Sequence, residues 1–372
     1  MKKKLRVGIL FGGKSAEHEI SIQSAKNIVE AIDKKKYQLV LIGIDKEGRW
    51  YLNDPARLLL YSSAQLPSLR TLGGTKKRVG LVPGKNSGEL VRIDDDRAEK
   101  PLDVVFPILH GPFGEDGTVQ GLLKLANIPF VGAGVLGSAL GMDKDAMKRL
   151  LRDAGVPIAK FLVFHRPQIG EMKFADIVGK VGLPFFVKPA NLGSSVGIHK
   201  VKNRRQFIGA VKDAFRYDAK ILIEEYIRGR EIECAVLGNR EPIASVPGEI
   251  IPRHEFYSYE AKYLDDQGAA LKIPAELPTP VVKKIQRLAV QTFKVLCCEG
   301  MARVDFFLRR NKEVIVNEIN TIPGFTKISM YPKLWEASGI SYTELIDRLI
   351  QLALERFKTE KELKTSYAPA RS

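Results

Sequence analysis

The chain has 372 residues, 45% hydrophobic and 27% charged, which is ordinary for a globular protein of two or three domains. No apolar run is long enough to span a membrane, and the basic residues 1–6 are not followed by a signal-peptide core, so we expect a cytoplasmic protein. The net charge of +16 fits an anionic substrate or nucleic acid. Because the basic residues are dispersed and no zinc-finger or RNA-binding signature accompanies them, we expect no nucleic-acid and no membrane partner.

The chain contains three cysteines, Cys234, Cys297 and Cys298. An odd, sparse count argues against a disulfide framework, and two adjacent cysteines do not match a common metal-ligand spacing. We therefore expect all three to be buried packing residues rather than metal ligands or nucleophiles.

The start of the chain predicts a strand over 5–11, an amphipathic helix from about 15 to 32 and a strand over 37–44. This β-α-β order predicts a parallel sheet. The turn at Gly12 and Gly13 is not a GxGxxG fingerprint, and no acidic residue follows at the usual place, which disfavours a nicotinamide cofactor.

Residues 52–100 are polar and rich in turn residues, and we expect them to be mostly peripheral. A buried strand over 103–109 follows and ends in the glycine-rich segment HGPFGEDG, residues 110–117. Open α/β sheets bind ligands in loops directly after strands. After the first strand the corresponding position holds Glu17, which could hold a substrate ammonium, although acids in the first turn of a helix are also common dipole partners.

The middle of the chain alternates helices and strands after Asp143, the predicted N-cap of a helix that runs to about 154. Further elements are predicted over 159–164 (strand), 184–188 (strand), 204–215 (helix), 220–226 (strand), 231–237 and 242–247 (a strand pair), and 279–297 (helix). The last helix starts at Ser341, which forms a capping box with Glu344, and should end near Phe357.

A small-residue loop, KPANLGSSVG, occupies residues 188–197. Glycine N–H groups and serine hydroxyls, including that of Ser195, can surround an anion. Lys188 and, from the neighbouring helix, Lys144 could supply positive charge for phosphate. The loop is not a Walker A sequence, so a P-loop fold is excluded, and a plain surface loop is the alternative interpretation.

Two alternating segments, 301–308 and 313–320, are rich in β-branched and aromatic residues and predict a hairpin. Asn tolerates the positive φ that tight turns need, so we place the turn symmetrically on Asn311 and Lys312. With this register, position i faces position 623 − i.

This register pairs Asp305 with Glu318 and Arg303 with Asn320, all on one face of the sheet. Facing like charges destabilise a sheet unless something lies between them. Oxygen ligands of this kind suit Mg²⁺ or Mn²⁺ shared with phosphate oxygens, so the hairpin predicts a metal site. The alternative is a polar sheet face paired by Arg303.

Two further segments carry weaker signals. An apolar strand leads into Glu224 and Glu225, where the strand edge could hold adenine and Glu231 a ribose hydroxyl, but a charged strand end explains this segment more simply. Directly after the metal hairpin, Gly324 could offer a bare N–H to an oxyanion and Ser329 could bind a carboxylate.

Several motifs occur together in one order along the chain. They are FGGKSAEHE (11–19), HGPFGEDG (110–117), MDK (142–144), KPANLGSSVG (188–197), YEAKY (259–263), RVD (303–305) and NEINTIPGFT (317–326). This ordered set resembles the D-alanine–D-alanine ligases of bacterial cell-wall synthesis, in their longer, A-type form.

The resemblance implies an α/β protein with the ATP-grasp fold and three α/β domains: 1–135, 136–225 and 226–372. ATP would lie between the central and C-terminal domains, beside a mobile loop near 253–268. ATP would phosphorylate the carboxylate of a first D-alanine, and the amine of a second D-alanine would displace the phosphate. ATP, two Mg²⁺ or Mn²⁺ ions per site and a homodimer are implied with it.

The resemblance also assigns roles to single residues. Those implied for the first D-alanine and closure of its site are Glu17, His110, Ser194 and Tyr263. Those implied for ATP are Lys144, Lys188, Ser195, Glu224, Glu225, Tyr226, Ile227 and Glu231. Those implied for the metal ions are Asp305, Glu318 and Asn320, with Glu318 bridging two ions. Those implied for the acyl phosphate and the oxyanion are Arg303 and Gly324, and those for the second carboxylate are Lys262 and Ser329.

Two alternatives remain open. A relative that makes a D-alanyl-D-lactate or D-alanyl-D-serine end would share the fold, but the lactate-forming relatives lose the loop tyrosine, and residues 260–263 here match the dipeptide-forming version. A catalytically silent nucleotide-binding or nucleic-acid-binding protein is suggested by the +16 charge, but it should have lost acids and lysines that are all present. Lys327 departs from the histidine often found at this place in shorter members, and adds positive charge near the second carboxylate.

Overall fold

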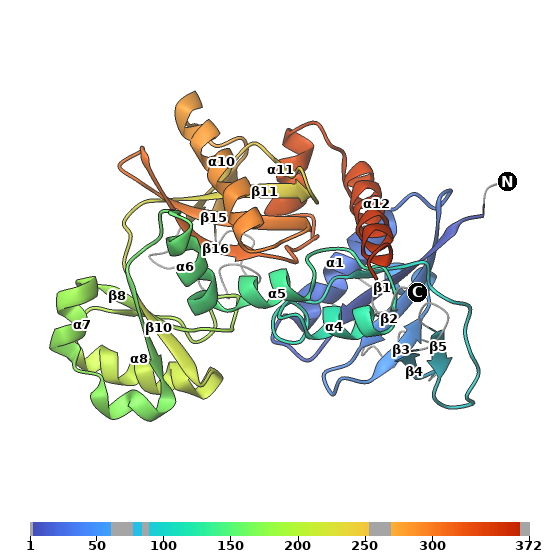
Figure 1. Ribbon diagram of the computed structural model, residues 1–372, viewed down its shortest axis with the longest axis horizontal. Coiled ribbons are helices and arrows are strands. Elements are labelled where there is room, and N and C mark those ends of the chain that lie inside the picture. The colour runs from blue at the N-terminus through green and yellow to red at the C-terminus, as the bar shows by residue number, and fades with distance from the viewer. Residues whose placement is uncertain (1–2, 61–76, 84–88, 253–268, 365–372) are drawn as a thin grey trace, which may run out of the picture.

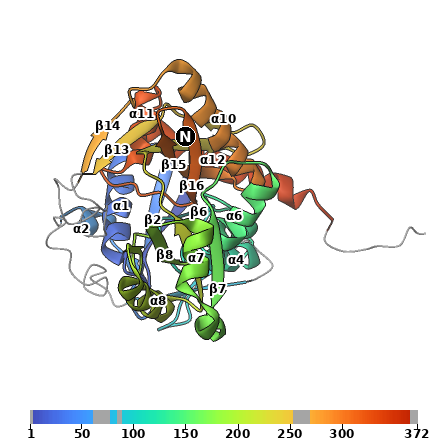
Figure 2. The same ribbon diagram turned by 90° about the vertical axis from the view of Figure 1, so that its left-hand side faces the viewer.

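The computed structural model describes residues 3–60, 77–83, 89–252 and 269–364. Three groups of strands and helices follow one another along its long axis (Figure 1). The blue N-terminal group lies at one end, the green and yellow central group at the other, and the orange C-terminal group lies between and above them. In Figure 2, viewed from the central end, α7 and α8 lie below α10, β13 and β14, so the central group sits beneath the C-terminal sheet.

The N-terminal group is built on a four-stranded sheet of order β3-β2-β1-β6, in which β1 pairs in parallel with β2 and β6. The predicted β-α-β unit and parallel sheet are confirmed. The elements are β1 (Leu5–Gly12), α1 (His18–Ala31), β2 (Tyr37–Ile44), β3 (Trp50–Asn53), α2 (Pro55–Leu60), β6 (Val104–Pro107) and α4 (Thr118–Leu125). The carboxyl ends of β1 and β6 therefore lie side by side, and both glycine-rich segments leave the sheet at the same edge.

Part of the region expected to be peripheral forms a separate two-stranded sheet of β4 (Val79–Val82) and β5 (Glu89–Arg92). Val79 and Leu90 are nonetheless buried and join the apolar cluster on one side of the N-terminal sheet. The described residues of this hairpin thus extend the core instead of only decorating the surface.

The central group is an antiparallel sheet of order β7-β10-β8-β9 covered by α7 and α8, with its own apolar core. Its elements are β7 (Phe161–His165), a 3-10 helix (Arg166–Glu171), α7 (Phe174–Val181), β8 (Phe185–Pro189), β9 (His199–Val201), α8 (Arg204–Tyr217) and β10 (Lys220–Glu225). It is joined to the N-terminal group by α5 (Val135–Met142) and α6 (Lys144–Asp153), which Figure 1 shows between the two.

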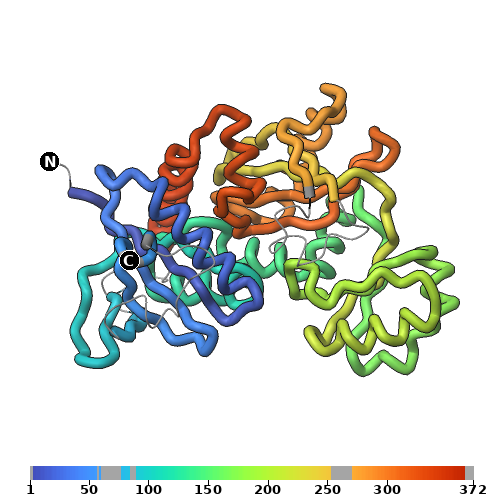
Figure 3. The backbone as a smooth tube through the Cα atoms, turned by 180° about the vertical axis from the view of Figure 1, so that it is seen from behind, coloured from blue at the N-terminus to red at the C-terminus, as the bar shows by residue number. Residues whose placement is uncertain are grey.

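The C-terminal group is a six-stranded sheet in which β14, β13, β11, β15 and β16 are neighbours in that order, and β12 pairs with β11. Its elements are β11 (Arg230–Gly238), β12 (Ile243–Ala244), β13 (Gly248–Pro252), β14 (Ala269–Lys272), α10 (Thr279–Val295), β15 (Gly300–Arg309), β16 (Glu313–Asn320), α11 (Met330–Ala337) and α12 (Tyr342–Lys361). One apolar cluster joins α12 and α11 to α1 and β1, so the two ends of the chain share a core (Figure 3).

The hairpin of β15 and β16 has the predicted pairs but not the predicted turn. Arg303 faces Asn320 and Asp305 faces Glu318, as expected, whereas near the turn Arg309 faces Glu313 across a three-residue loop. A β-bulge at Asp305 and Phe306 restores the register beyond it. Asn311 does have a positive φ, +56°.

Two smaller expectations are wrong. Helix α12 continues one turn beyond Phe357 to Lys361. Basic residues in this last turn stabilise the helix end by their interaction with the helix dipole. Cys297 is exposed, while Cys234 and Cys298 are buried. Cys297 follows the end of α10 in a left-handed conformation, with φ of +53°. Its side chain is therefore exposed, whereas the side chain of the next residue, Cys298, is buried in the apolar core. No helix of the described residues is long and apolar enough to cross a bilayer.

Candidate active site

A cleft of about 660 Å³ lies where the three groups meet. Many of the residues singled out from the sequence line it. They are Glu17, His110, Lys144, Ser194, Glu231, Arg303, Asp305, Glu318, Asn320, Gly324 and Ser329. The N-terminal group contributes the first two, α6 and the small-residue loop the next two, and the C-terminal sheet with its following turn the rest.

Three carboxylates lie in a row across neighbouring strands of the C-terminal sheet. Glu233 of β11 faces Asp305 of β15, which faces Glu318 of β16. Arg303 binds Asp305 through two contacts of 2.7 Å and approaches Glu233 at 2.9 Å. At the other end of the row, the ammonium of Lys144 lies 3.8 Å from Glu318. Within this row of described residues, three carboxylates are therefore paired with two cationic side chains, Arg303 and Lys144.

The chemistry of this row fits a divalent cation. The Oδ1 of Asn320 is buried, and among the described residues nothing donates a hydrogen bond to it. No group of three or more His, Cys, Asp or Glu in the described ranges is arranged to hold a metal by itself. Mg²⁺ is commonly bound by one or two carboxylates together with substrate phosphates, so Asp305, Glu318 and an amide oxygen suffice as the protein's share.

The small-residue loop between β8 and β9 reaches across to the N-terminal group. Its backbone takes left-handed conformations at Ser194 (φ +53°) and Ser195 (φ +61°). The hydroxyl of Ser194 donates a short hydrogen bond to Glu17, just before α1. Glu17 is buried, so the contact holds a carboxylate at the wall of the cleft in a fixed position.

Both candidate phosphate lysines are buried, but they have different partners. Lys144 donates from its ammonium to the carbonyl of Leu192, in the small-residue loop, at 2.7 Å. Lys188 lies 3.4 Å from Glu224, which also lies 3.3 Å from Lys148. Burial alone would raise the pKa of Glu224, but the two ammonium groups outweigh burial and lower that pKa. Burial lowers the pKa of the Lys148 ammonium.

The other candidate residues for the adenosine do not line the 660 Å³ cleft, apart from Glu231. The N–H of Glu225 donates to the carbonyl of Lys160 at 2.9 Å, and the ring of Tyr226 lies 4.1 Å from the ammonium of Lys200. Ile227 is buried. These residues and Glu224 form the end of β10 and the segment after it, next to Lys188 of β8.

His110 is buried and held on both sides by the polypeptide. Its Nδ1 lies 3.1 Å from the carbonyl of Ile322 and its Nε2 lies 3.4 Å from the hydroxyl of Ser24. Burial lowers its pKa, which favours a neutral ring that donates from Nδ1. Ser24 also accepts a bond from the N–H of Phe325, so His110 is tied to the turn that follows β16.

That turn contains Gly324 and Ser329. A Cβ at Gly324 would lie 2.8 Å from the hydroxyl oxygen of Ser329, so any other residue there would displace it. The same oxygen accepts a bond of 3.0 Å from the N–H of Thr326. The absence of a side chain brings the Gly324 backbone close to the cleft. Lys262 and Tyr263 lie outside the described residues.

Three buried ionisable residues of the site were not predicted. Glu115 lies in the glycine-rich segment after β6 and accepts a bond of 2.6 Å from the N–H of Gly111. Burial, together with the nearby charge of Glu17, raises its pKa to about 8. Lys148 could have been found from its i, i+4 spacing to Lys144 on one helix. Glu233 could not, because no short turn fixes the register of β11 against β15.

Comparisons with known proteins agree with this geometry. Residues 6–133 match the family "D-ala D-ala ligase N-terminus" and residues 150–351 match "D-ala D-ala ligase C-terminus". The chain is 54% identical to D-alanine–D-alanine ligase A of Salmonella typhimurium over 363 residues, covering 98% of this chain and 99% of that protein.

Two solved structures are also similar. The D-alanine–D-alanine ligase of Coxiella burnetii has a TM-score of 0.86 and 44% identity, with 96% of each chain covered. The VanG D-Ala:D-Ser ligase of Enterococcus faecalis has a TM-score of 0.82 and 36% identity, covering 94% of this chain and all of that one. The α/β fold expected from the sequence, ATP-grasp, is therefore confirmed, and the chain belongs to the D-alanine–D-alanine ligase family.

Proposed function

We propose that this protein joins two D-alanines to D-alanyl-D-alanine at the expense of ATP, through a D-alanyl phosphate, for peptidoglycan precursors. The observation that carries the proposal is the convergence in one cleft of an ammonium-binding carboxylate, a phosphate lysine and a carboxylate pair: Glu17, Lys144, and Asp305 with Glu318. Family membership at 54% identity over 98% of the chain supports the same reaction.

In the first step, the carboxylate of the first D-alanine attacks the γ-phosphorus of ATP and ADP leaves. Glu17 holds the substrate ammonium, and the bond from Ser194 keeps Glu17 in place. Lys144 and Lys188 bind the phosphates, with Ser195 as a further donor, and neutralise charge as it moves to the leaving oxygen. Glu224, the backbone of Glu225–Ile227 and Glu231 receive the adenosine.

Asp305, Glu318 and Asn320 would hold two Mg²⁺ or Mn²⁺ ions, with Glu318 as a ligand common to both. Such ions, when bound, neutralise the β- and γ-phosphate oxygens and orient them for in-line transfer. The negative charge gathered in the carboxylate row and the buried Asn320 oxygen support this proposal.

In the second step, the amine of the second D-alanine attacks the acyl phosphate carbon, an oxyanion forms, and phosphate leaves as the amide is made. The Gly324 N–H and Arg303 stabilise the oxyanion. Ser329 and Lys262 take the second carboxylate, and Tyr263 closes the site with Ser194 and Glu17. His110, kept neutral by burial, helps to shape the first substrate's pocket.

Three wider features belong to the same proposal: a homodimer, a cytoplasmic location, and the division into domains 1–135, 136–225 and 226–372 with a mobile loop near 253–268. Gel filtration with light scattering tests the dimer. Limited proteolysis with and without nucleotide tests the loop.

The experiment that tests the function is phosphate release from Mg-ATP with D-alanine, L-alanine, D-lactate and D-serine, alone and in pairs, with products identified by mass. We expect release with D-alanine alone, yielding its dipeptide. Release with no pair would refute the proposal.

A second candidate is a D-alanine–D-serine ligase, since the chain shares 36% identity and nearly its whole length with an enzyme of that name. Release only when D-serine accompanies D-alanine would favour it, and would keep the fold and the first step. The residues expected to decide, 260–263, match the dipeptide-forming version.

A further inference from the structure

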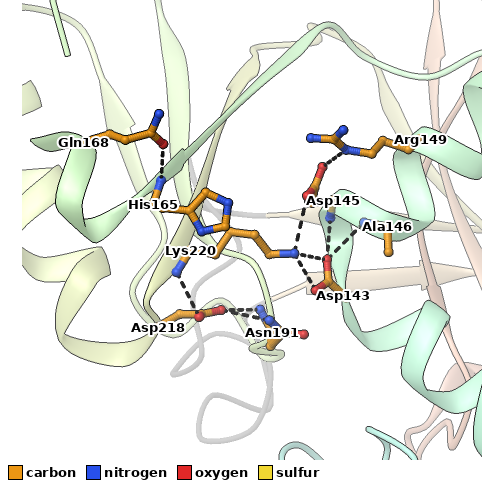
Figure 4. A network of polar contacts seen from close by, with 9 residues as sticks. All are labelled: Asp143, Asp145, Ala146, Arg149, His165, Gln168, Asn191, Asp218 and Lys220. Carbon is orange, nitrogen blue, oxygen red and sulfur yellow. Dashed lines mark hydrogen bonds and ion pairs between the residues drawn. The ribbon is translucent and has the colours of Figure 1, made fainter. Parts of the chain in front are cut away.

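Lys220, the first residue of β10, holds the start of helix α6. Its ammonium lies 2.8 and 2.6 Å from the two carboxylate oxygens of Asp143 and 3.4 Å from Asp145 (Figure 4). Asp143 is also the N-cap of α6 and accepts bonds of 3.0 Å from the N–H groups of Asp145 and Ala146. One carboxylate therefore both starts the helix and ties it to the central sheet.

The same strand start also fixes the base of the small-residue loop. The N–H of Lys220 donates to Asp218 at 3.0 Å, and Asp218 accepts bonds of 2.8 and 3.1 Å from the N–H and the side-chain amide of Asn191 (Figure 4). The carbonyl of Lys220 accepts a bond of 3.0 Å from the N–H of Ala190. Backbone and aspartate thus hold the residues immediately before the loop.

Lys144 connects helix α6 back to the small-residue loop. It follows Asp143 directly, its N–H donates to the carbonyl of Ala190 at 3.0 Å, and its ammonium donates to the carbonyl of Leu192 at 2.7 Å. The phosphate lysine and the loop are therefore held against each other, and both are held by Lys220. The Lys220 side chain is 17% exposed and lies between the partly buried Asp143 and the buried Asp145, so it is neither a free surface charge nor part of the deep core.

We propose that Lys220 is a positioning residue for the phosphates of ATP: its contact with Asp143 clamps α6 to the base of the small-residue loop and so fixes Lys144 beside that loop. The inference rests on the proposed binding of phosphates by Lys144. Lys220 itself touches no reacting group. Its effect reaches the nucleotide through Lys144, which contacts the loop at Ala190 and Leu192, before the Ser194 that binds Glu17.

The test is Lys220→Met, which keeps the length of the side chain and removes the ammonium. We expect the KM for ATP and the Kd for AMPPNP, measured by calorimetry with Mg²⁺, to rise about tenfold, the size of one charge-assisted contact. The KM for D-alanine should rise by less than the KM for ATP, because Ser194 and Glu17 contact each other beyond the residues that Lys144 binds. Lys220→Arg should restore most of the nucleotide affinity. A role in general stability alone would lower the melting temperature without separating the two KM values.

A second variant separates the clamp from plain electrostatics and from folding. In Asp143→Asn the asparagine remains a good N-cap, so α6 should start normally. Removing a negative charge near the phosphate lysines would tighten AMPPNP binding if charge alone mattered, whereas loss of the clamp weakens it. Arg149→Gln is the matched control, because Arg149 binds the other oxygen of Asp145 from the solvent side, at 2.5 Å, and should leave AMPPNP binding unchanged.

Unchanged AMPPNP affinity in Lys220→Met, or tighter binding in Asp143→Asn, would overturn the proposal. Because AMPPNP binding needs no turnover, it reports on the clamp even if the wild-type protein made no D-alanyl-D-alanine. Failure of the ligase reaction and failure of the clamp are therefore separate outcomes.

Discussion

Acidic side chains outnumber basic ones on the hairpin face, whereas basic side chains outnumber acidic ones in the buried ion-pair cluster of the central group. Across the C-terminal sheet, the three carboxylates Glu233, Asp305 and Glu318 face the cations of Arg303 and Lys144, and the Glu318 side chain remains 34% exposed to the cleft. In the central group, Lys148 and Lys188 outnumber Glu224, and all three side chains are nearly or fully buried.

This difference supports the proposal that the two regions bind a nucleotide and its metal ions together. The row of three carboxylates on the C-terminal sheet can accept divalent cations. The triad of Lys148, Lys188 and Glu224 has one positive charge in excess, which can attract anionic phosphate. The row contains a partly exposed carboxylate and should matter mainly for catalysis. The triad is nearly or fully buried, and its contacts should matter for folding as well.

The largest expected effect is on the hairpin face. Glu318→Ala removes the carboxylate proposed to lie between two ions, and we expect phosphate release to fall by more than the roughly 10–100-fold that outer-shell residues of metal sites cost. The fold should survive, because the side chain is partly exposed. The measurement is phosphate release with D-alanine at several Mg²⁺ concentrations.

The matched control is Glu313→Ala, which removes an exposed acid at the turn end of the same strand, where it pairs with Arg309. It should leave turnover unchanged. Near-normal release by the Glu318 variant would mean that the hairpin carboxylates do not act as proposed.

The next effect concerns stability in the central group. Lys148→Met removes one buried contact of Glu224 but leaves Glu224 paired with Lys188, so we expect the free energy of unfolding to drop by about 1.5–3 kcal/mol. Adding Glu224→Gln should increase this loss, since Lys188 would then keep a buried charge without its carboxylate partner. Urea denaturation of the three proteins gives the measurement.

As a comparison, Lys36→Met breaks an exposed contact of 3.1 Å with Asp347 and should cost about 0–1 kcal/mol. If the Lys148 variant were no less stable than this one, the buried contact between Lys148 and Glu224 would not contribute to folding as expected.

The two regions also differ in how far the sequence predicts them. The pairs Asp305–Glu318 and Arg303–Asn320 follow from period-two alternation within one hairpin, and the bulge compensates for the misjudged turn. The N-cap at Asp143 is likewise a local signal and is confirmed. The triad is not local, because its members come from α6, β8 and β10, and only the packing of three elements brings them together.

Helix α5 illustrates the same limit. Its sequence, VLGSALGM, contains two glycines and gives little helix signal. In the fold, a Cβ at Gly137 would lie 2.6 Å from the carbonyl oxygen of Cys297, and one at Gly141 would lie 2.7 Å from the methyl of Thr321. Glycine is required there by close packing against other elements, which a single sequence does not reveal.

The smallest expected effect is at Glu115, which lies outside both regions, in the glycine-rich segment after β6. Its pKa of about 8, far above its ordinary value of 4.5, means that the folded protein keeps this carboxyl protonated where the unfolded chain ionises it. Its contribution to stability is therefore fully present below about pH 4.5 and is lost as the pH rises towards 8.

Glu115→Gln keeps an acceptor for the Gly111 N–H but cannot ionise. Relative to the wild type, it should gain stability on the order of 1 kcal/mol per pH unit between pH 6 and 8. Urea midpoints across this range measure the gain, and Glu47→Gln, at an exposed carboxylate, should run parallel to the wild type. If the Glu115→Gln variant also ran parallel, Glu115 would be ionised next to Glu17 in the wild type, and the first-substrate wall of the cleft would then carry two negative charges instead of one.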